Sequence, residues 1–247
     1  MPATSVKVEG AIATITLERP RSGNSVTDRM AAEINDACRR ISQDDAVRVV
    51  IVTGEGDAFC RGSEPPSDGM YGELRVAGSL ASIDKPVIAA INGDAIDQGL
   101  ELALACDIRI VAKTARLGLT HLSRGLMPWD GGTQRLPRTV GRARALEMVL
   151  TSRLVDADEA ADMGLVSLVV DGSEVYRKAL EVASTIAEHG PVAVRYVKEA
   201  LLKGMDLTVD QGMRLEADLN IILQTTQDRT EGIRSFLDRR PPHFTGR

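Results

Sequence analysis

The sequence is poor in several residue types that mark particular classes of protein. Of its 247 residues only 3% are aromatic, and it holds three cysteines, three histidines and one tryptophan. Cys38, Cys60 and Cys106 cannot all pair and none lies in a C-x-x-C motif, so we expect reduced, buried thiols of a cytoplasmic protein. The three scattered histidines predict no metal site.

Long apolar runs and an excess of positive charge are also missing. No run of about 18 apolar residues occurs, so we expect no membrane span. The N-terminus lacks the basic-then-apolar pattern of a signal peptide. The net charge of −5 argues against nucleic acid as a partner. What the chain does have is 43% hydrophobic residues, enough for the core of one large domain or of one domain with an appendage.

The order of the expected elements indicates an α/β core followed by helices. The alternation in 5–8 and 12–17 predicts two strands joined by a turn, and the apolar run 47–53 predicts a strand buried on both faces. Thr27 is expected to begin a helix between these strands. From Ser173 onward the hydrophobic pattern is helical throughout. We therefore expect a helical tail that packs on the core or on another subunit.

The stretch 85–107 (KPVIAAINGDAIDQGLELALACD) forms the centre of the expected site. Val87–Ile91 is short and apolar, which is typical of a buried strand, and Asp97 is expected to cap the helix that follows. A strand that leads into a helix start brings free backbone N–H groups together, where they can stabilise negative charge on an oxygen. Glu101 lies one turn into this helix, where an exposed helix face explains a glutamate about as well as a site does.

Four segments, in order, resemble the crotonase (enoyl-CoA hydratase/isomerase) family. The resemblance implies an α/β fold in which a spiral of ββα units over 1–190 precedes a helical region over 191–247 that forms homotrimers or hexamers. It also implies an acyl-CoA thioester as substrate, with coenzyme A as part of that substrate and no other cofactor. Two backbone N–H groups would bind the thioester oxygen and stabilise an enolate. The segments are RVVIVTGEGDAFCRGSE (48–64), KPVIAAINGDAIDQGLELALACDIRI (85–110), 124–170 and EGIRSFLDRRPPHFTGR (231–247).

The resemblance places the two oxyanion-hole donors at Ser63 and Gln98. At Ser63, which follows Gly62, only the backbone N–H is needed, so serine is compatible. Gln98 lies where the family often has three successive glycines, and its side chain adds bulk near the substrate. The carboxylate of Asp97, if it points inward, would compete for the same donors. We therefore expect a weakened or reshaped oxyanion hole.

The resemblance also places the acid–base residues. Hydratases of the family use two glutamates that hold one water, one taking a proton while the other gives one. The first position matches Glu101, whereas the second holds His121, a suitable general base at neutral pH. Nine positions later, Asp130 is expected to orient this imidazole or to carry a proton itself, and Trp129 to line the acyl pocket. The structural alternatives are a helix cap for His121, a turn for Asp130 and a core position for Trp129.

Three functional hypotheses follow. The first is an enoyl-CoA hydratase or isomerase in which Glu101 works with His121 or Asp130. The second is a C–C bond hydrolase of β-diketone type, because such family members pair a histidine with an aspartate at the same spacing and also lack glycine at the second donor position. The third is a catalytically silent homologue that acts as a binding subunit, which the altered glycine run favours.

Two further features concern the substrate. Segment 64–72 is rich in Pro, Gly and Ser and predicts a surface loop, shorter than the family often has, that would open or reshape the pocket. Basic residues are candidates for contact with the CoA phosphates, although a solvated surface is the commoner role for any one of them. These residues are Arg19, Arg21, Arg239 and Arg240.

Overall fold

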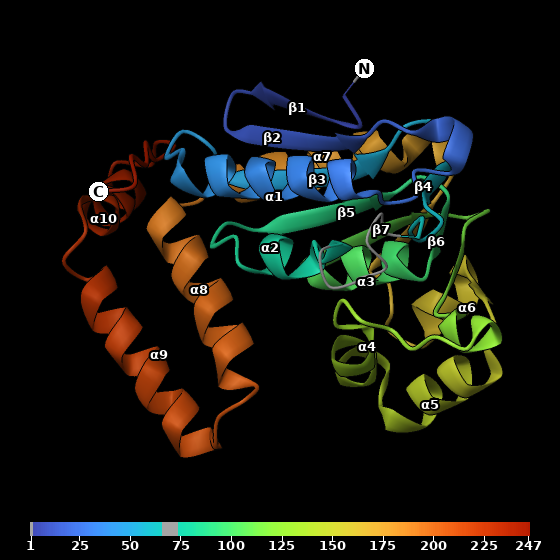
Figure 1. The fold of residues 1–247 in the computed structure, drawn as a ribbon. Coiled ribbons are helices and arrows are strands. Elements are labelled where there is room, and N and C mark those ends of the chain that lie inside the picture. Colours follow the sequence, from blue (N-terminus) through green and yellow to red (C-terminus); the bar gives the residue numbers. More distant parts are fainter. Residues whose placement is uncertain (1, 66–73) are drawn as a thin grey trace.

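A computed structural model describes residues 2–65 and 74–247 of the chain (Figure 1). Most of the surface loop expected at 64–72 therefore lies outside the described residues. Within these residues, no helix is both long and apolar enough to cross a membrane. All three cysteines are free and buried, and burial raises the pKa of each thiol to about 12. At neutral pH these thiols stay protonated and unreactive.

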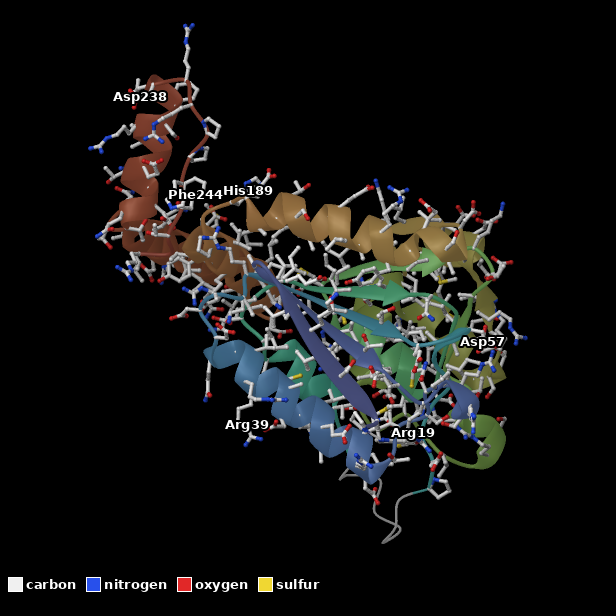
Figure 2. The ribbon with its side chains drawn as sticks, turned by 90° about the horizontal axis from the view of Figure 1, so that it is seen from above. Arg19, Arg39, Asp57, His189, Asp238 and Phe244 are labelled. Carbon is white, nitrogen blue, oxygen red and sulfur yellow. The ribbon has the colours of Figure 1, made fainter. Side chains whose placement is uncertain are left out.

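A six-stranded sheet lies at the centre of the fold. Its first two strands are antiparallel and every later pair is parallel. The central strands are apolar because helices cover both faces of the sheet, with α1 (Asp28–Gln43) on one side and α7 (Val175–Ala187) on the other (Figure 2). In spatial order the strands are β1 (Thr4–Glu9), β2 (Ile12–Leu17), β3 (Val49–Gly54), β5 (Val87–Ile91), β7 (Ile108–Ala112) and β10 (Leu168–Val170).

A second sheet of four short strands lies beside the first. Each of its first three strands follows directly on a strand of the large sheet, so β3 leads to β4, β5 to β6 and β7 to β8. A helix or helical turn comes after each pair, and this repeat is the predicted spiral of ββα units. The strands are β4 (Ala58–Cys60), β6 (Asp94–Ile96), β8 (Arg116–Gly118) and β9 (Val155–Asp156).

The helices of the core begin where the sequence supplies a cap or a turn. The Thr27 side chain accepts a hydrogen bond from Met30 N at 3.3 Å and so begins α1, as predicted. Short 3₁₀ turns occur at Pro20–Ser22, His121–Arg124 and Gly172–Glu174. The remaining helices of the core are α2 (Ala77–Ala81), α3 (Gln98–Ala105), α4 (Gly132–Val140), α5 (Arg142–Thr151) and α6 (Ala157–Asp162).

Three C-terminal helices extend away from the core (Figure 1). They are α8 (Pro191–Gly204), α9 (Val209–Leu223) and α10 (Gln227–Leu237). These helices expose many large apolar side chains to solvent. The members of this apolar surface are Val197, Leu201, Leu202, Met205, Val209, Met213, Ile221, Ile222, Ile233, Phe236 and Leu237.

Candidate active site

The candidate site is built around the junction of β6 and α3. Asp97 occupies this junction with φ of 53°, in the left-handed region, and its N–H donates to Gly118 O of β8 at 2.8 Å. Asp97 does occupy the predicted N-cap position of α3, but its side chain makes no capping bond to the helix. Its carboxylate instead accepts from Thr120 N at 2.6 Å and pairs with the Arg124 guanidinium. Asp97 therefore joins the start of α3 to the turn that carries His121.

The two expected oxyanion donors follow neighbouring strands. Val26 N donates to Gly62 O and Glu64 N donates to Val26 O, each at 2.9 Å. In such a parallel bridge the N–H of the residue between them, Ser63, points to the opposite side. Gln98 is the first residue of α3, so its N–H has no partner within the helix. Because β4 pairs with β6 in parallel, both donors lie just beyond the carboxyl ends of adjacent strands.

The Gln98 side chain is directed into the protein. It is fully buried, and its Nε2 donates to Leu74 O at 2.5 Å and to Asp130 Oδ2 at 3.1 Å. We expected this side chain to add bulk beside the substrate, but it instead links the start of α3 to Leu74 and Asp130. The following glycine is required for close packing, since a Cβ on Gly99 would come within 1.9 Å of Cys60 O.

Asp130 holds the start of α2 rather than the imidazole. Its Oδ2 accepts from Val76 N at 2.8 Å and Ala77 N at 3.0 Å, in addition to Gln98 Nε2. Among the residues that the structure describes, the carboxylates within 4.0 Å of the His121 ring nitrogens are those of Asp97 and Glu101. The orienting role expected for Asp130 therefore does not match its position, because its carboxylate already serves the N–H groups at a helix start.

Glu101 is fully buried, which rules out the exposed helix face. Its Oε1 accepts from Asp130 N at 2.9 Å and Gly132 N at 2.8 Å. Its Oε2 is buried and has no hydrogen-bond partner among the described residues. Burial raises the pKa of Glu101 to about 7, and the carboxylates of Asp130 and Asp97 add to this rise while the two backbone N–H groups oppose it. The carboxyl group is held by one oxygen and leaves the other available.

His121 faces Glu101 across the site. Its Nε2 is 3.9 Å from Glu101 Oε2 and its Nδ1 is 3.3 Å from Asp97 Oδ1, but neither nitrogen makes an aligned hydrogen bond within the described part of the chain. The half-buried Trp129 packs edge-on against the imidazole, with ring centroids 4.8 Å apart. Burial lowers the pKa of His121, Asp97 acts to raise it and Arg124 to lower it, so the ring is neutral at pH 7.

No metal site accompanies these residues. Over residues 2–65 and 74–247, no group of three or more His, Cys, Asp or Glu side chains is arranged to hold a metal ion. The acid–base chemistry that the arrangement supports is proton transfer between a neutral imidazole and a carboxyl group.

The basic residues proposed for CoA are not brought together within one chain. Arg19 donates to Ser25 O and pairs with Glu64, while Arg240 pairs with Glu231. Figure 2 shows Arg19 and the segment at Asp238 at opposite ends of the molecule. These basic residues therefore do not form one cluster.

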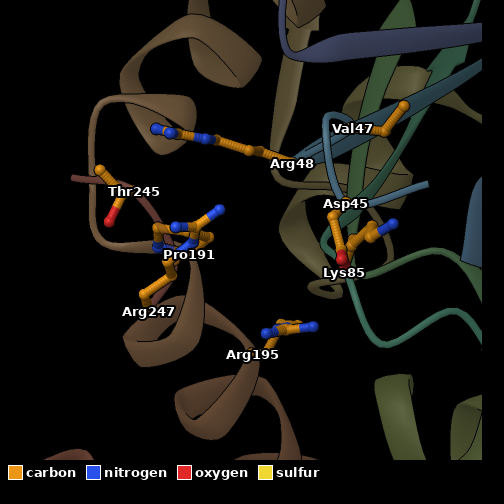
Figure 3. Close-up of a pocket in the computed structure, with 9 residues that line it drawn as sticks. Asp45, Val47, Arg48, Lys85, Pro191, Arg195, Thr245 and Arg247 are labelled. Atoms are coloured by element: carbon orange, nitrogen blue, oxygen red, sulfur yellow. The ribbon is translucent and has the colours of Figure 1, made fainter. Parts of the chain in front are cut away.

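A basic pocket of about 260 Å³ lies near the amino ends of β3 and β5, away from the candidate site (Figure 3). Arg48 donates to Ala187 O and Phe244 O, and Lys85 donates to Ile41 O and Asp44 O. These cationic groups already have backbone acceptors. Their role is to hold the C-terminal segment and neighbouring turns against the core.

Comparisons with known proteins agree with the fold. The family model described as enoyl-CoA hydratase/isomerase matches residues 7–247. The chain belongs to this family. Among its relatives, the crotonyl-CoA hydratase of Syntrophomonas wolfei is 36% identical, covering 96% of this chain and 95% of the relative. The putative enoyl-CoA hydratase/isomerase YngF of Bacillus subtilis is 38% identical, covering 95% of each.

Solved structures of the enoyl-CoA hydratase/isomerase family confirm the predicted fold class. A crystal structure of an enoyl-CoA hydratase from Bacillus anthracis has a TM-score of 0.96 and 38% identity, covering 99% of this chain and 100% of that one. A structure of an enoyl-CoA hydratase from Mycobacterium tuberculosis has a TM-score of 0.94 and 30% identity, and covers 100% of both chains. The predicted family and enzyme class, enoyl-CoA hydratase/isomerase-like, are thereby confirmed.

Proposed function

We propose that Glu101 and His121 form an unequal acid–base pair that acts on an unsaturated acyl-CoA thioester. One observation carries the proposal: Glu101 Oε2 and His121 Nε2 are both buried, both lack an aligned partner among the described residues, and lie 3.9 Å apart. Burying polar atoms without partners is costly, so their retention favours a catalytic over a silent protein. Backbone N–H groups of Ser63 and Gln98 would form the oxyanion hole.

The two groups have different protonation states near neutral pH. His121 is neutral and takes the proton of a water molecule on Nε2, while the water oxygen bonds to Cβ of the substrate. The electron pair of the double bond moves onto the thioester oxygen as an enolate, held by the two N–H groups. Glu101, with its pKa raised to about 7, then gives a proton to Cα. Transfer of the proton from His121 to Glu101 restores the starting state.

This division predicts a bell-shaped dependence of kcat/KM on pH. Activity falls below the pKa of His121, which lies under its usual 6.5, because a protonated imidazole cannot accept a proton. Activity also falls above about 7, where Glu101 loses the proton it donates.

The hydrolase alternative keeps some support, because a carboxylate does lie beside His121. That carboxylate is Asp97, 3.3 Å from Nδ1, and not the Asp130 of the sequence-based hypothesis. A histidine–aspartate pair of this kind could activate water for attack on a ketone.

The assembly, the location and the cofactor also belong to the proposal. We infer a homotrimer or hexamer, because the many large apolar side chains exposed on α8–α10 favour contact with another chain. The free, buried cysteines support a cytoplasmic location. We propose coenzyme A only as part of the substrate, with no other cofactor.

Absorbance of the conjugated thioester tests the proposal. Hydration of crotonyl-CoA removes this absorbance, and a double-bond shift in a 3-enoyl-CoA creates it. His121→Ala is expected to lower kcat about 10²–10⁴-fold, while His243→Ala, which removes an exposed histidine, leaves it unchanged. Cleavage of a cyclic β-diketone without CoA would support the hydrolase instead. Binding of crotonyl-CoA without turnover of any of these substrates would support the silent homologue.

A further inference from the structure

We propose that Asp97 is a positioning residue for His121, and that its carboxylate keeps the imidazole proton on Nδ1 and the lone pair on Nε2. The observation behind it is the placement of one carboxylate at each side of the ring, with Asp97 Oδ1 3.3 Å from Nδ1 and Glu101 Oε2 3.9 Å from Nε2. The inference rests on the proposed role of His121 as the base, and it identifies Asp97 as the group that keeps Nε2 free to accept a proton.

The Asp97 carboxylate is itself held in place. Thr120 donates to it through its backbone N at 2.6 Å and its hydroxyl at 3.1 Å, and the half-exposed Arg124 pairs with Oδ2. The side chain is 4% exposed. A carboxylate fixed by three donors cannot follow the imidazole, so the imidazole must orient to the carboxylate.

Electrostatics selects one tautomer of the neutral ring. With the proton on Nδ1, the N–H faces the Asp97 carboxylate, which attracts it. With the proton on Nε2, the Nδ1 lone pair would face that carboxylate, which is repulsive. Only the first tautomer leaves an acceptor on Nε2, toward Glu101 and the place where a water would react. The Nδ1 contact is not aligned in the free chain, and contacts of this kind commonly tighten when substrate binds.

Asp97→Asn is the test variant. Asparagine has nearly the same shape as aspartate, so it removes the charge and leaves the size of the buried side chain unchanged. We expect kcat for crotonyl-CoA hydration to fall roughly 10- to 100-fold with KM nearly unchanged. Loss of the carboxylate also moves the acidic limb of the kcat/KM profile to lower pH, because Asp97 acts to raise the pKa of His121.

Asp94→Asn is the matched control. Asp94 lies on β6, is 7% exposed, accepts from Arg116 N at 3.1 Å and pairs with Arg61 and Arg116. Like Asp97 it is a buried carboxylate held by a backbone N–H and arginine, but no described histidine pairs with it. Its loss should lower the melting temperature and leave the acidic limb in place. A purely structural role for Asp97 would make the two variants alike, and that result would overturn the proposal.

Arg124→Gln supplies an independent check on the sign. The charged groups that face His121 are Asp97 and Glu101 from α3 and its start, and Arg124 from its own turn. Arg124 acts to lower the pKa of His121, so its removal should move the acidic limb to higher pH, opposite to Asp97→Asn. A shift in the same direction for both variants would contradict the inference.

The tautomer can be observed directly by ¹⁵N NMR of protein labelled at histidine. His189 and His243 are exposed, and His121→Ala identifies the remaining signal. We expect the Nδ1–H form for His121 in the unchanged protein, and the Nε2–H form would overturn the proposal. This measurement, like the Arg124→Gln profile, decides the matter even if Asp97→Asn does not fold. Since it needs no turnover, it also separates failure of this inference from failure of the proposed function.

Discussion

The start of α3 and the C-terminal helices depart from the usual distribution of residues in opposite ways. At the start of α3 the polar residues Asp97, Gln98 and Glu101 are at most 3% exposed. On the C-terminal helices the apolar side chains of Val209 and Phe236 are 78% and 82% exposed. Each inversion is unfavourable for an isolated chain, the first through desolvation and the second through exposed apolar surface.

The difference indicates that the two regions are suited to binding partners of different kinds. Among the described residues, the buried side-chain atoms at the start of α3 without a hydrogen-bond partner are Gln98 Oε1 and Glu101 Oε2, and Glu101 Oε2 faces His121 Nε2. That pattern suits a small polar reactant. The C-terminal helices instead expose many large apolar side chains, which suits another protein chain.

The largest expected effect comes from placing a charge on the apolar surface of α8. Leu201 is 67% exposed, and Leu201→Asp would bury an unpaired carboxylate in each interface of the proposed trimer. An uncompensated buried charge costs about 3–5 kcal/mol, so the assembly should dissociate to monomers at micromolar concentration. Light scattering coupled to size-exclusion chromatography measures this.

Thr185→Asp is the control for that variant. Thr185 is exposed on α7, where the neighbouring exposed side chains are polar, so the same added charge should leave the assembly intact. A wild-type chain that is monomeric, or an assembled Leu201→Asp variant, would break the comparison, because the apolar surface would then have no protein partner of this kind.

The next largest effect is on stability at the start of α3. Glu101 has a folded pKa of about 7, above its ordinary 4.5, so the folded state binds its proton more tightly than the unfolded state. Its burial therefore carries no charge penalty below pH 4.5, and the penalty grows as pH rises through 7 to about 3 kcal/mol. Glu101→Gln removes this penalty while its amide oxygen can still accept from Asp130 N and Gly132 N.

Urea unfolding of both proteins from pH 5 to pH 8.5 tests this sign. Glu101→Gln should gain stability over the wild type progressively with pH, even as it loses activity. A stability difference that does not change with pH would mean that Glu101 is solvated in the folded protein. The position of Glu101 at the start of α3 would then not be unfavourable for folding, and the comparison with the C-terminal helices would fail.

The sequence predicted best those features that depend on near neighbours in the chain. Thr27 begins α1 and Val87–Ile91 forms β5 with the expected bounds, because a cap and a buried strand are defined by a few consecutive residues. The spiral of ββα units and the positions of Glu101 and His121 came from the resemblance to the family, and the burial of both residues now gives those positions a physical basis.

Contacts between distant segments could not be predicted in this way. Asp97 was expected to cap α3, but its positive φ directs the carboxylate to Thr120 and Arg124 on another turn. Gln98 was expected to crowd the substrate, but its side chain reaches Leu74 O. Both outcomes depend on the direction of one side chain and on which segment lies opposite it. A pattern in the sequence contains neither kind of information.

The smallest expected effect distinguishes Asp130 from Asp97 as the aspartate that orients His121. Asp130→Asn keeps an acceptor for Val76 N and Ala77 N but removes its charge from the start of α2, which should cost about 1 kcal/mol in the free energy of unfolding. The acidic limb of its kcat/KM profile should stay where the wild type has it. If that limb moves for Asp130→Asn and stays for Asp97→Asn, the aspartate nine positions after His121 is the orienting group. Asp97 would then have no part in orienting the imidazole.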